Sequence, residues 1–296
     1  MKNSKFRELL AAGAPVIVDG GLATQLEAQG CDLHNPLWSA SVLTEDPEQI
    51  VKAHRAYLDA GAQIIISASY QAIDSELITI ATELALRARD EFVAENPQAD
   101  RPLVAASVGP YGAILADGSE YTGVYDKGSA ALEEFHRARL QQLDASDVDL
   151  LACETIPSID EALALARLLT TVTTPAWVTF CCRNGEQLSD GTALEDAAAL
   201  FQGVPAVRAI GVNCTGPQYI VELIDRILAT LPGMPAVAYP NSGEAFDITD
   251  KTWSGTAPED DWVGAAESWV AAGATVIGGC CRIGPEHIRA LRRVHA

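Results

Sequence analysis

At residues 207–214 the chain reads Val-Arg-Ala-Ile-Gly-Val-Asn-Cys, a short apolar run that ends in an amide and a thiol. The run lacks strict alternation of apolar and polar residues, which is typical of strands buried on both faces of a parallel sheet. Seven other runs resemble it. Together they predict eight buried strands, at 16–19, 63–67, 103–107, 149–153, 176–180, 207–213, 236–239 and 275–277.

Helical patterns separate these strands, at 47–60, 75–95, 129–144, 159–170, 193–202, 218–231, 258–272 and 285–294. Several begin with start signals such as Asp46-Pro47-Glu48, where a cap residue, a proline and an early acid suit the free amides of a helix N-terminus. Alternating β and α units indicate either a closed barrel or an open doubly wound sheet. The count of eight favours an α/β fold of the (β/α)8 TIM barrel type.

The length of the chain fits this architecture. A chain of 296 residues is ordinary for one barrel, so we expect a single domain over residues 1–296. The glycine-rich segment 109–123 is interpreted as an elongated loop after the third strand. Polar and reactive side chains, including Asp19, Ser107 and Glu154, stand where the runs end. In barrels the active site lies at these carboxyl ends of the strands.

The charge balance restricts the partners of the protein. Forty acidic and 20 basic side chains give a formal charge of −20, which repels nucleic-acid phosphates and anionic membranes and favours cationic small molecules. No apolar stretch reaches the roughly 18 residues that a membrane span needs. The N-terminal segment lacks an apolar signal core, so we expect a cytoplasmic protein without nucleic-acid or membrane partners.

Seven cysteines, an odd number with two adjacent pairs, suit a reducing compartment. Cys214 follows the sixth predicted strand, and Cys280-Cys281 follow the eighth after two glycines, Gly278 and Gly279, which we expect to let the backbone turn sharply. Three thiolates are suitable ligands for zinc and leave a fourth position open for a substrate. The alternative is three buried structural cysteines.

The remaining cysteines fit ordinary roles. Cys181 and Cys182 follow the fifth strand without glycines, and we interpret them as packing residues; Cys31 and Cys153 are expected to be buried thiols. A zinc ion held by three thiolates activates water poorly but holds a fourth thiolate well. A thiol bound there loses its proton at neutral pH, and its natural reaction is attack on an electrophilic alkyl carbon.

Eight recognisable motifs follow one another over nearly the whole chain. They are Val18-Asp19-Gly20-Gly21-Leu22-Ala23-Thr24, Asn35-Pro36-Leu37-Trp38-Ser39-Ala40, Ala68-Ser69-Tyr70-Gln71-Ala72, Ser107-Val108-Gly109-Pro110-Tyr111-Gly112, Cys153-Glu154-Thr155, Gly211-Val212-Asn213-Cys214, Tyr239-Pro240-Asn241-Ser242-Gly243-Glu244 and Gly278-Gly279-Cys280-Cys281. Together they resemble the homocysteine S-methyltransferase family. The chain is most similar to the stand-alone bacterial and plant enzymes that use S-methylmethionine.

The resemblance implies a (β/α)8 barrel with one catalytic Zn²⁺ per chain, held by Cys214, Cys280 and Cys281. It also implies methyl transfer from a sulfonium donor, S-methylmethionine or S-adenosylmethionine, to the zinc-bound thiolate of homocysteine, which forms methionine. No further catalytic residue is implied. Asp19 and Glu154 occupy the positions that bind the homocysteine ammonium in the family; for Asp19 a plain helix cap is the alternative.

Other residues are candidates for substrate binding. The backbone amides of Gly20, Gly21 and Leu22 suit the substrate carboxylate, since glycines permit close approach and a helix start offers free N–H groups. Asn213 precedes the first zinc ligand and is included as a substrate-binding residue. For the sulfonium, aromatic faces and carboxylates are expected. The candidates by position are Trp38, which we prefer, and Tyr111, Tyr121 and Glu244.

None of the five histidines is required, because a sulfonium leaves as a neutral thioether without a general acid. One departure from the family is a short segment after Gln71, which leads almost directly into the helix at 75–95 and borders the expected active mouth.

Three alternatives remain open. The same scaffold suits a selenocysteine or other thiol methyltransferase. A thiol redox or zinc-buffering protein is disfavoured, because the adjacent Cys280 and Cys281 have Cα atoms too close for an ordinary disulfide. An inactive barrel that serves as a partner module would need a second polypeptide to supply the methyl group.

Overall fold

A computed structural model describes residues 2–33, 38–247, 252–254 and 261–294. Eight parallel strands form one sheet in the order β1-β10-β7-β6-β5-β4-β3-β2. The parallel bridge between Val18 and Ile64 brings the end of β1 against β2 and closes the sheet into a barrel. The strands are β1 (Val16–Ile17), β2 (Ile64–Ile66), β3 (Leu103–Val108), β4 (Leu150–Ile156), β5 (Ala176–Phe180), β6 (Val207–Asn213), β7 (Ala236–Tyr239) and β10 (Ala274–Ile277). The predicted (β/α)8 barrel is confirmed, and each strand coincides with a predicted run.

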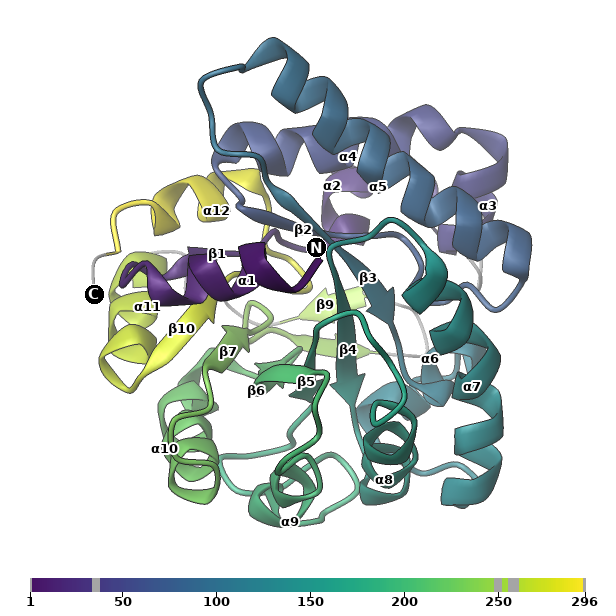
Figure 1. Cartoon of the computed structure of the whole chain (residues 1–296), viewed down its shortest axis with the longest axis vertical. Coiled ribbons are helices and arrows are strands. Elements are labelled where there is room, and N and C mark those ends of the chain that lie inside the picture. Colours follow the sequence, from purple (N-terminus) through teal and green to yellow (C-terminus); the bar gives the residue numbers. More distant parts are fainter. Residues whose placement is uncertain (1, 34–37, 248–251, 255–260, 295–296) are drawn as a thin grey trace.

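The helices that follow the strands lie around the outside of the barrel (Figure 1). Each matches a predicted helical pattern, with differences confined to the ends. Asp74 and Ser158 cap α5 and α8, because their side chains accept hydrogen bonds from the backbone N–H of Glu76 and Glu161. The helices are α4 (Pro47–Ala60), α5 (Ser75–Glu95), α7 (Ser129–Ala145), α8 (Ile159–Leu168), α9 (Leu194–Ala199), α10 (Ile220–Thr230), α11 (Trp262–Ala271) and α12 (Pro285–Leu291).

Several elements were not predicted. The expected loop at 109–123 contains a short helix, α6 (Tyr111–Leu115), and a 3-10 turn, η1 (Ser119–Tyr121). Gly112 lets them pack together, since a Cβ atom there would lie 2.4 Å from the backbone N of Glu120. Helix α2 (Leu22–Ala28) begins at the helix start expected after Gly20 and Gly21. The other additions are α1 (Lys2–Ala11), α3 (Trp38–Glu45), η2 (Pro217–Tyr219) and the hairpin of β8 (Ala245–Asp247) and β9 (Thr252–Ser254).

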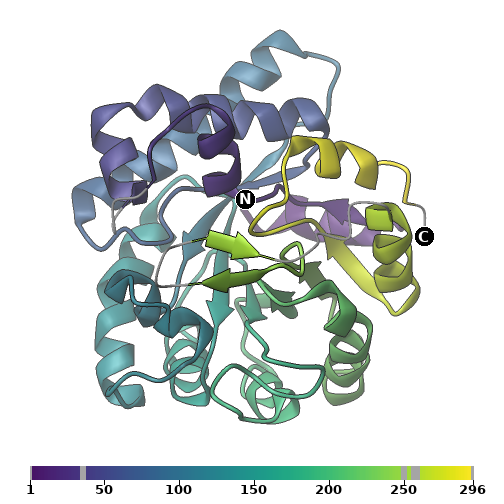
Figure 2. The same cartoon turned by 180° about the vertical axis from the view of Figure 1, so that it is seen from behind.

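Two of these additions lie at opposite ends of the barrel. Helix α1 lies across one end in Figure 1, and the β8–β9 hairpin lies across the other end in Figure 2. Phe6 of α1 is buried and packs against Trp177, with ring centroids 6.0 Å apart. It belongs to the apolar cluster of the barrel interior, with first residues of strands such as Val16, Ile64 and Leu103. Helix α1 therefore closes the amino end of the barrel and leaves the carboxyl end for the site.

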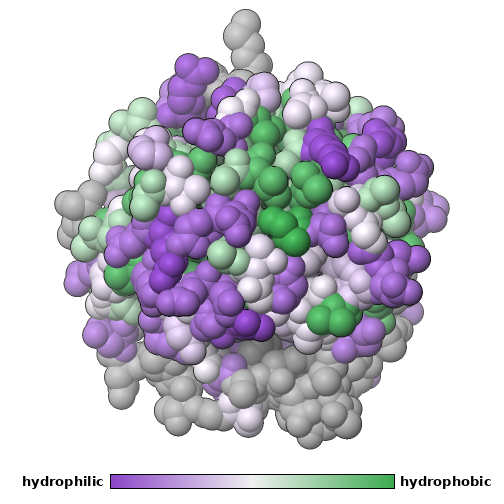
Figure 3. Space-filling view, turned by 90° about the horizontal axis from the view of Figure 1, so that it is seen from below, coloured by the Kyte–Doolittle hydropathy of each residue, from purple (hydrophilic) through white to green (hydrophobic). Residues whose placement is uncertain are grey.

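On the side of the molecule shown in Figure 3, hydrophilic side chains predominate, with smaller hydrophobic areas between them. Exposed large apolar side chains are few among the described residues: Ile73, Leu115, Val124 and Val221. Within the same residues, no helix has both the length and the apolar character needed to cross a membrane.

Candidate active site

A cavity of about 360 Å³ opens at the carboxyl ends of the strands. Its walls come from the ends of β1, β2, β4, β6, β7 and β10, together with α2 and the η1 turn. The charged residues that line it are five acids and one base, namely Asp19, Glu27, Asp32, Glu120, Glu154 and Arg282. Since Arg282 forms an ion pair with Glu244, at 3.1 Å between Nε and Oε2, the cavity carries an excess of negative charge and favours cationic groups.

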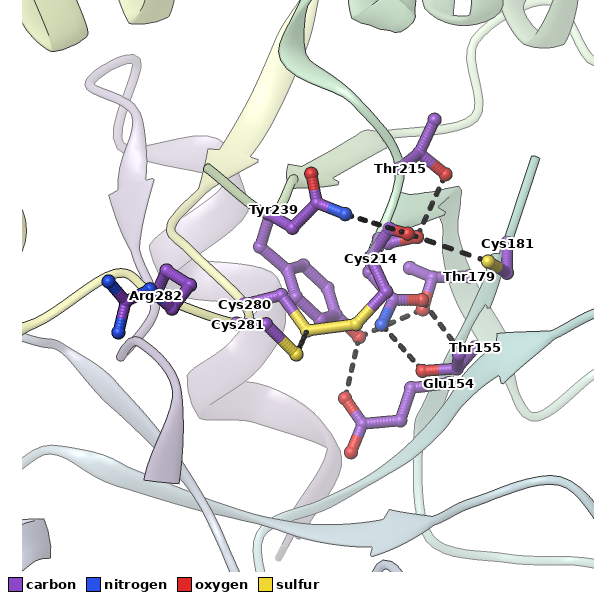
Figure 4. Close-up of a disulfide and its surroundings, with 12 residues drawn as sticks. Glu154, Thr155, Thr179, Cys181, Cys214, Thr215, Tyr239, Cys280, Cys281 and Arg282 are labelled. Atoms are coloured by element: carbon purple, nitrogen blue, oxygen red, sulfur yellow. Dashed lines mark hydrogen bonds between the residues drawn. A yellow bond between two sulfur atoms is a disulfide. The ribbon is translucent and has the colours of Figure 1, made fainter. Parts of the chain in front are cut away.

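Three cysteines gather at this mouth. The Sγ atoms of Cys214, Cys280 and Cys281 all lie within 4.8 Å of one another, although 66 positions separate the first two. Cys214 and Cys280 are joined by a disulfide in this structure, whereas the sequence led us to expect three free thiols. Their Cα atoms are 5.5 Å apart, inside the range that disulfides need, unlike those of adjacent residues. Figure 4 shows the thiol of Cys281 beside this pair.

The donor set fits a metal ion once the disulfide is reduced. Reduction yields three thiols, and in a tetrahedral zinc site with Zn–S bonds of about 2.3 Å the sulfurs lie about 3.8 Å apart. The separations in this cluster, up to 4.8 Å, require only small movements of the side chains to reach that value. Soft thiolates in this number select zinc over hard cations.

Glycines let the loop that carries Cys280 and Cys281 lie close to β1. A Cβ atom on Gly21 would lie 2.6 Å from the carbonyl oxygen of Cys280, and one on Gly278 would lie 2.6 Å from the side chain of Val18. Gly278 and Gly279 therefore serve close packing rather than the sharp turn expected from the sequence. The N–H of Gly21 donates to the carbonyl of Ile283 at 3.0 Å, so this amide already has a partner other than a substrate carboxylate. Gly20 lines the cavity.

Asp19 projects into the cavity from the end of β1. Its Oδ2 accepts a hydrogen bond from the backbone N–H of Ile66 at 2.8 Å, which fixes the carboxyl against β2. Helix α2 begins after Gly21 without a side-chain cap, so the helix-cap alternative for Asp19 does not hold. Burial raises the pKa of Asp19 well above its usual value, and the charge of Glu154 raises it further. The two acids share one low-dielectric site, where a cation would stabilise both charges.

Glu154 is held by hydroxyl groups of neighbouring strands. Ser107 donates to its Oε1, and the hydroxyl of Tyr239 donates to its Oε2 at 3.0 Å. Trp177 and Thr179 in turn contact the Tyr239 hydroxyl, at 3.2 and 2.8 Å, so the acid belongs to a network inside the barrel. Burial raises the pKa of Glu154 to about 7, although both hydrogen bonds oppose this shift. Figure 4 shows Glu154 and Tyr239 beside the sulfur cluster.

Left-handed backbone conformations are concentrated at the cavity. The non-glycine residues with positive φ in the described part of the chain are Ala116, Thr155, Cys214 and Arg282, and all of them line the cavity. Such conformations cost about 1–3 kcal/mol each and are most unusual for a β-branched residue such as Thr155. The surrounding structure must therefore hold the backbone in place at the site.

Asn213 provides this support for Thr155. Its Oδ1 accepts from the N–H of Thr155 at 2.7 Å, and its Nδ2 donates to the Thr155 hydroxyl at 2.8 Å. Asn213 is fully buried and is not among the cavity-lining residues. The side chain expected to touch substrate thus ties the end of β4 to the end of β6, directly before Cys214.

The proposed sulfonium contacts are spread over different places. Tyr121 lines the cavity, and its hydroxyl lies 3.8 Å from the Sγ of Cys281. Tyr111 instead packs edge-on against Tyr125, and Glu244 pairs with Arg282 outside the cavity lining. Trp38 is the first residue of α3, and its side chain lies outside the described part of the structure.

Several cavity residues were not anticipated from the sequence. Glu120 and Tyr70 line the cavity, and Cys31, expected to be buried, is partly exposed there. For Tyr70 the signal was its place in a motif at the end of β2. For Glu120 there was none, because the 109–123 segment looked like a loop. Cys153, Cys181 and Cys182 are buried, as expected.

Comparisons with known proteins agree with this geometry. Residues 16–295 match the family model described as Homocysteine S-methyltransferase. A homocysteine S-methyltransferase of Escherichia coli (strain K12) is 46% identical, with 98% of each chain covered. A selenocysteine Se-methyltransferase of Brassica oleracea var. italica is 41% identical, with 97% of this chain and 91% of the relative covered.

Solved structures show the same similarity. The crystal structure of the homocysteine methyltransferase MmuM from Escherichia coli in its metallated form superimposes with a TM-score of 0.86 at 44% identity, covering 97% of this chain and 98% of the other. The chain therefore belongs to the homocysteine S-methyltransferase family.

Proposed function

We propose that the protein transfers a methyl group from S-methylmethionine to the thiolate of L-homocysteine, and that residues 1–296 act as one homocysteine-binding barrel domain. The observation that carries this proposal is the cluster of three cysteine sulfurs at a cavity lined by buried acids. Cys214, Cys280 and Cys281 would hold one Zn²⁺ per chain. When bound, the ion lowers the pKa of a substrate thiol so that it is a thiolate at neutral pH.

Asp19 and Glu154 would bind the ammonium group of homocysteine. Both are buried and face one cavity, and each carries an uncompensated negative charge when ionised. The N–H of Ile66 and the hydroxyls of Ser107 and Tyr239 orient their oxygens. An ammonium placed between them satisfies both charges and directs the rest of the amino acid along the cavity toward the sulfur cluster.

The reaction needs no general acid. The homocysteine sulfur attacks the methyl carbon, a new S–CH₃ bond forms, and the bond between that carbon and the donor sulfonium breaks. The electron pair of the broken bond stays on the donor sulfur, which becomes a neutral thioether, and the thiol proton of homocysteine leaves to solvent. An anion and a cation are thus converted into two neutral products, a change that a low-dielectric cavity favours over water.

Methionine formation by the reduced, zinc-loaded protein tests the proposal. With homocysteine and S-methylmethionine we expect two molecules of methionine for each methyl group transferred, and slower transfer with S-adenosylmethionine. Absence of methionine with both donors would refute the proposal.

A second acceptor, selenocysteine, is favoured by one observation, the 41% identity to a selenocysteine Se-methyltransferase. The same assay with selenocysteine in place of homocysteine separates the two. We expect a higher kcat/KM for homocysteine, and the reverse order would assign the protein to selenium metabolism.

A further inference from the structure

Glu120, a half-buried acid of the cavity, differs from Asp19 and Glu154 in having a carboxylate oxygen that is buried without a hydrogen-bond partner. Its Oε2 is shielded from solvent and has no hydrogen-bond partner among the described residues. No lysine, arginine or histidine of the described chain forms an ion pair with it. A partly buried carboxylate without a partner is costly, and in a native protein it calls for a ligand or ion that completes it.

The neighbours of Glu120 are aromatic rings. Tyr70 and Tyr121 line the same cavity, and the next residue along the chain from Glu120 is Tyr121 itself. Tyr70 is held firmly, because Arg139 donates to its carbonyl oxygen at 3.2 Å and Gly109 packs against its ring. A carboxylate that lies beside aromatic rings, with one buried oxygen that has no hydrogen-bond partner among the described residues, matches a cation that cannot donate hydrogen bonds.

Both amino acid substrates carry an ammonium, and the methyl donor carries a sulfonium in addition. An ammonium donates hydrogen bonds, and it fits Asp19 and Glu154, whose oxygens are already oriented by donors from β2, β3 and β7. A sulfonium has a positive charge but no N–H or O–H group. It gains from through-space attraction to a carboxylate and from contact with aromatic rings, which is what the surroundings of Glu120 offer.

Glu120 also lies near the place where the methyl group is received. The hydroxyl of Tyr121 is 3.8 Å from the Sγ of Cys281. Glu120, Tyr121 and Cys281 all line the same cavity. A sulfonium beside Glu120 would therefore stand next to the sulfur cluster. The η1 turn that carries Glu120 is fixed against α6 at Gly112.

We propose that Glu120, with the rings of Tyr70 and Tyr121, forms the subsite for the sulfonium group of the methyl donor, an inference that rests on the proposed methyltransferase function. The subsite recognises the positive charge of the donor, whereas Asp19 and Glu154 recognise an ammonium. Glu120 is thus a specificity-determining residue for a cationic donor over its neutral thioether product, which helps the product to leave.

The test compares two ligands and two variants. The ligands are S-methylmethionine and its carbon isostere, in which a CH group replaces the positively charged sulfur. The variants are Glu120→Gln and, as a control, Glu27→Gln, which removes the same charge from an exposed position of the same cavity wall. Dissociation constants are measured by calorimetry on the zinc-loaded protein without homocysteine, so that no turnover occurs.

We expect Glu120→Gln to weaken S-methylmethionine by about tenfold or more, as loss of a partly buried charge pair predicts. Its effect on the isostere should stay below about twofold, and so should the effect of Glu27→Gln on either ligand. Tyr70→Leu should also weaken S-methylmethionine more than the isostere, which keeps the test open if Glu120→Gln fails to fold. Equal losses for the two ligands, or equal effects of the two glutamine variants, would overturn the subsite.

Failure of this inference is distinguishable from failure of the proposed function. If the wild-type protein forms methionine from S-methylmethionine but Glu120→Gln binds that donor normally, only the sulfonium subsite is refuted. If the wild-type protein forms no methionine from any sulfonium donor, the proposed function and the subsite fall together.

Discussion

The acids of the cavity differ in the atoms that surround their oxygens, and the tasks that we propose for them follow from this difference. Glu154 accepts hydrogen bonds from two hydroxyls, Asp19 accepts one from a backbone amide, and Glu120 Oε2 accepts none among the described residues. All three have a raised pKa, with burial as the main cause. The sequence shows where Asp19 and Glu154 stand, at strand ends, but the donors that orient them come from other strands and become visible only in the fold.

Glu154→Gln should raise the homocysteine KM by about tenfold or more and leave kcat within about threefold, because an ammonium contact is lost while the thiol cluster persists. The pH dependence should change as well. With its pKa raised to about 7, Glu154 is neutral below this pH, so the wild-type KM should rise as the pH falls through 7. Steady-state kinetics from about pH 6 to about pH 8, one unit on either side of this pKa, measures the change in KM. If the homocysteine KM of Glu154→Gln depends on pH in the same way as that of the wild type, the role of Glu154 is contradicted.

Asn213→Ala should destabilise the protein by about 2–4 kcal/mol, because the buried N–H and hydroxyl of Thr155 both lose their partner. Thr155→Ala is the matched control. It removes only the hydroxyl and keeps the bond from its N–H to Asn213, so it should cost about half as much. Urea denaturation of the reduced protein gives both values. If Asn213→Ala unfolds like the wild type but has lost substrate affinity, the side chain contacts substrate directly instead.

At the scale of elements, helix α1 covers the amino end of the barrel and does not belong to the candidate active site. Phe6→Ala should destabilise the protein by about 3–5 kcal/mol, the usual cost of removing a large buried aromatic side chain. The homocysteine KM at low temperature should stay unchanged, because Phe6 packs at the amino ends of the strands. Arg7→Ala, on the exposed neighbour, is the control and should change neither quantity. Thermal melts, together with kinetics at about 20 °C, provide the comparison. A homocysteine KM that rises in Phe6→Ala but not in Arg7→Ala would show that α1 affects substrate binding.

The barrel elements could be predicted from the sequence because their signals are local. Continuous apolar runs and capped helical patterns identified all eight strands and the eight helices that follow them. The additional elements lack such signals. Helix α6 and the η1 turn lie in a glycine-rich segment whose order depends on close packing at Gly112, and α1 is explained by contacts of Phe6 with strands far along the chain. The periodicity of apolar residues along the chain does not indicate tertiary contacts of this kind.

At the scale of the whole molecule, closure of the barrel brings the ends of β6 and β10 together. The sequence placed Cys214 and Cys280-Cys281 at these strand ends, and the fold sets their sulfurs within 4.8 Å of one another. The sequence did not predict the disulfide between Cys214 and Cys280, because whether two sulfurs bond depends on Cα geometry that only the folded barrel defines.

The oxidised and reduced proteins should differ in metal binding. A disulfide between Cys214 and Cys280 removes two of the three proposed thiolate ligands, so the oxidised protein should bind far less than one zinc per chain. Thiol titration in denaturant should count five free thiols before reduction and seven after it, since five of the seven cysteines are free in this structure. Zinc content measured on the same two samples completes the test; stoichiometric zinc in the five-thiol protein would show that other residues hold the metal.

X-ray absorption at the zinc edge, recorded on the reduced protein before and after homocysteine is added, tests most directly whether Cys214, Cys280 and Cys281 hold a zinc ion that accepts the substrate thiol. We expect three sulfur ligands without homocysteine and four with it. Two or fewer cysteine ligands, or a sulfur count that homocysteine does not change, would contradict the zinc site and the methyl transfer built on it.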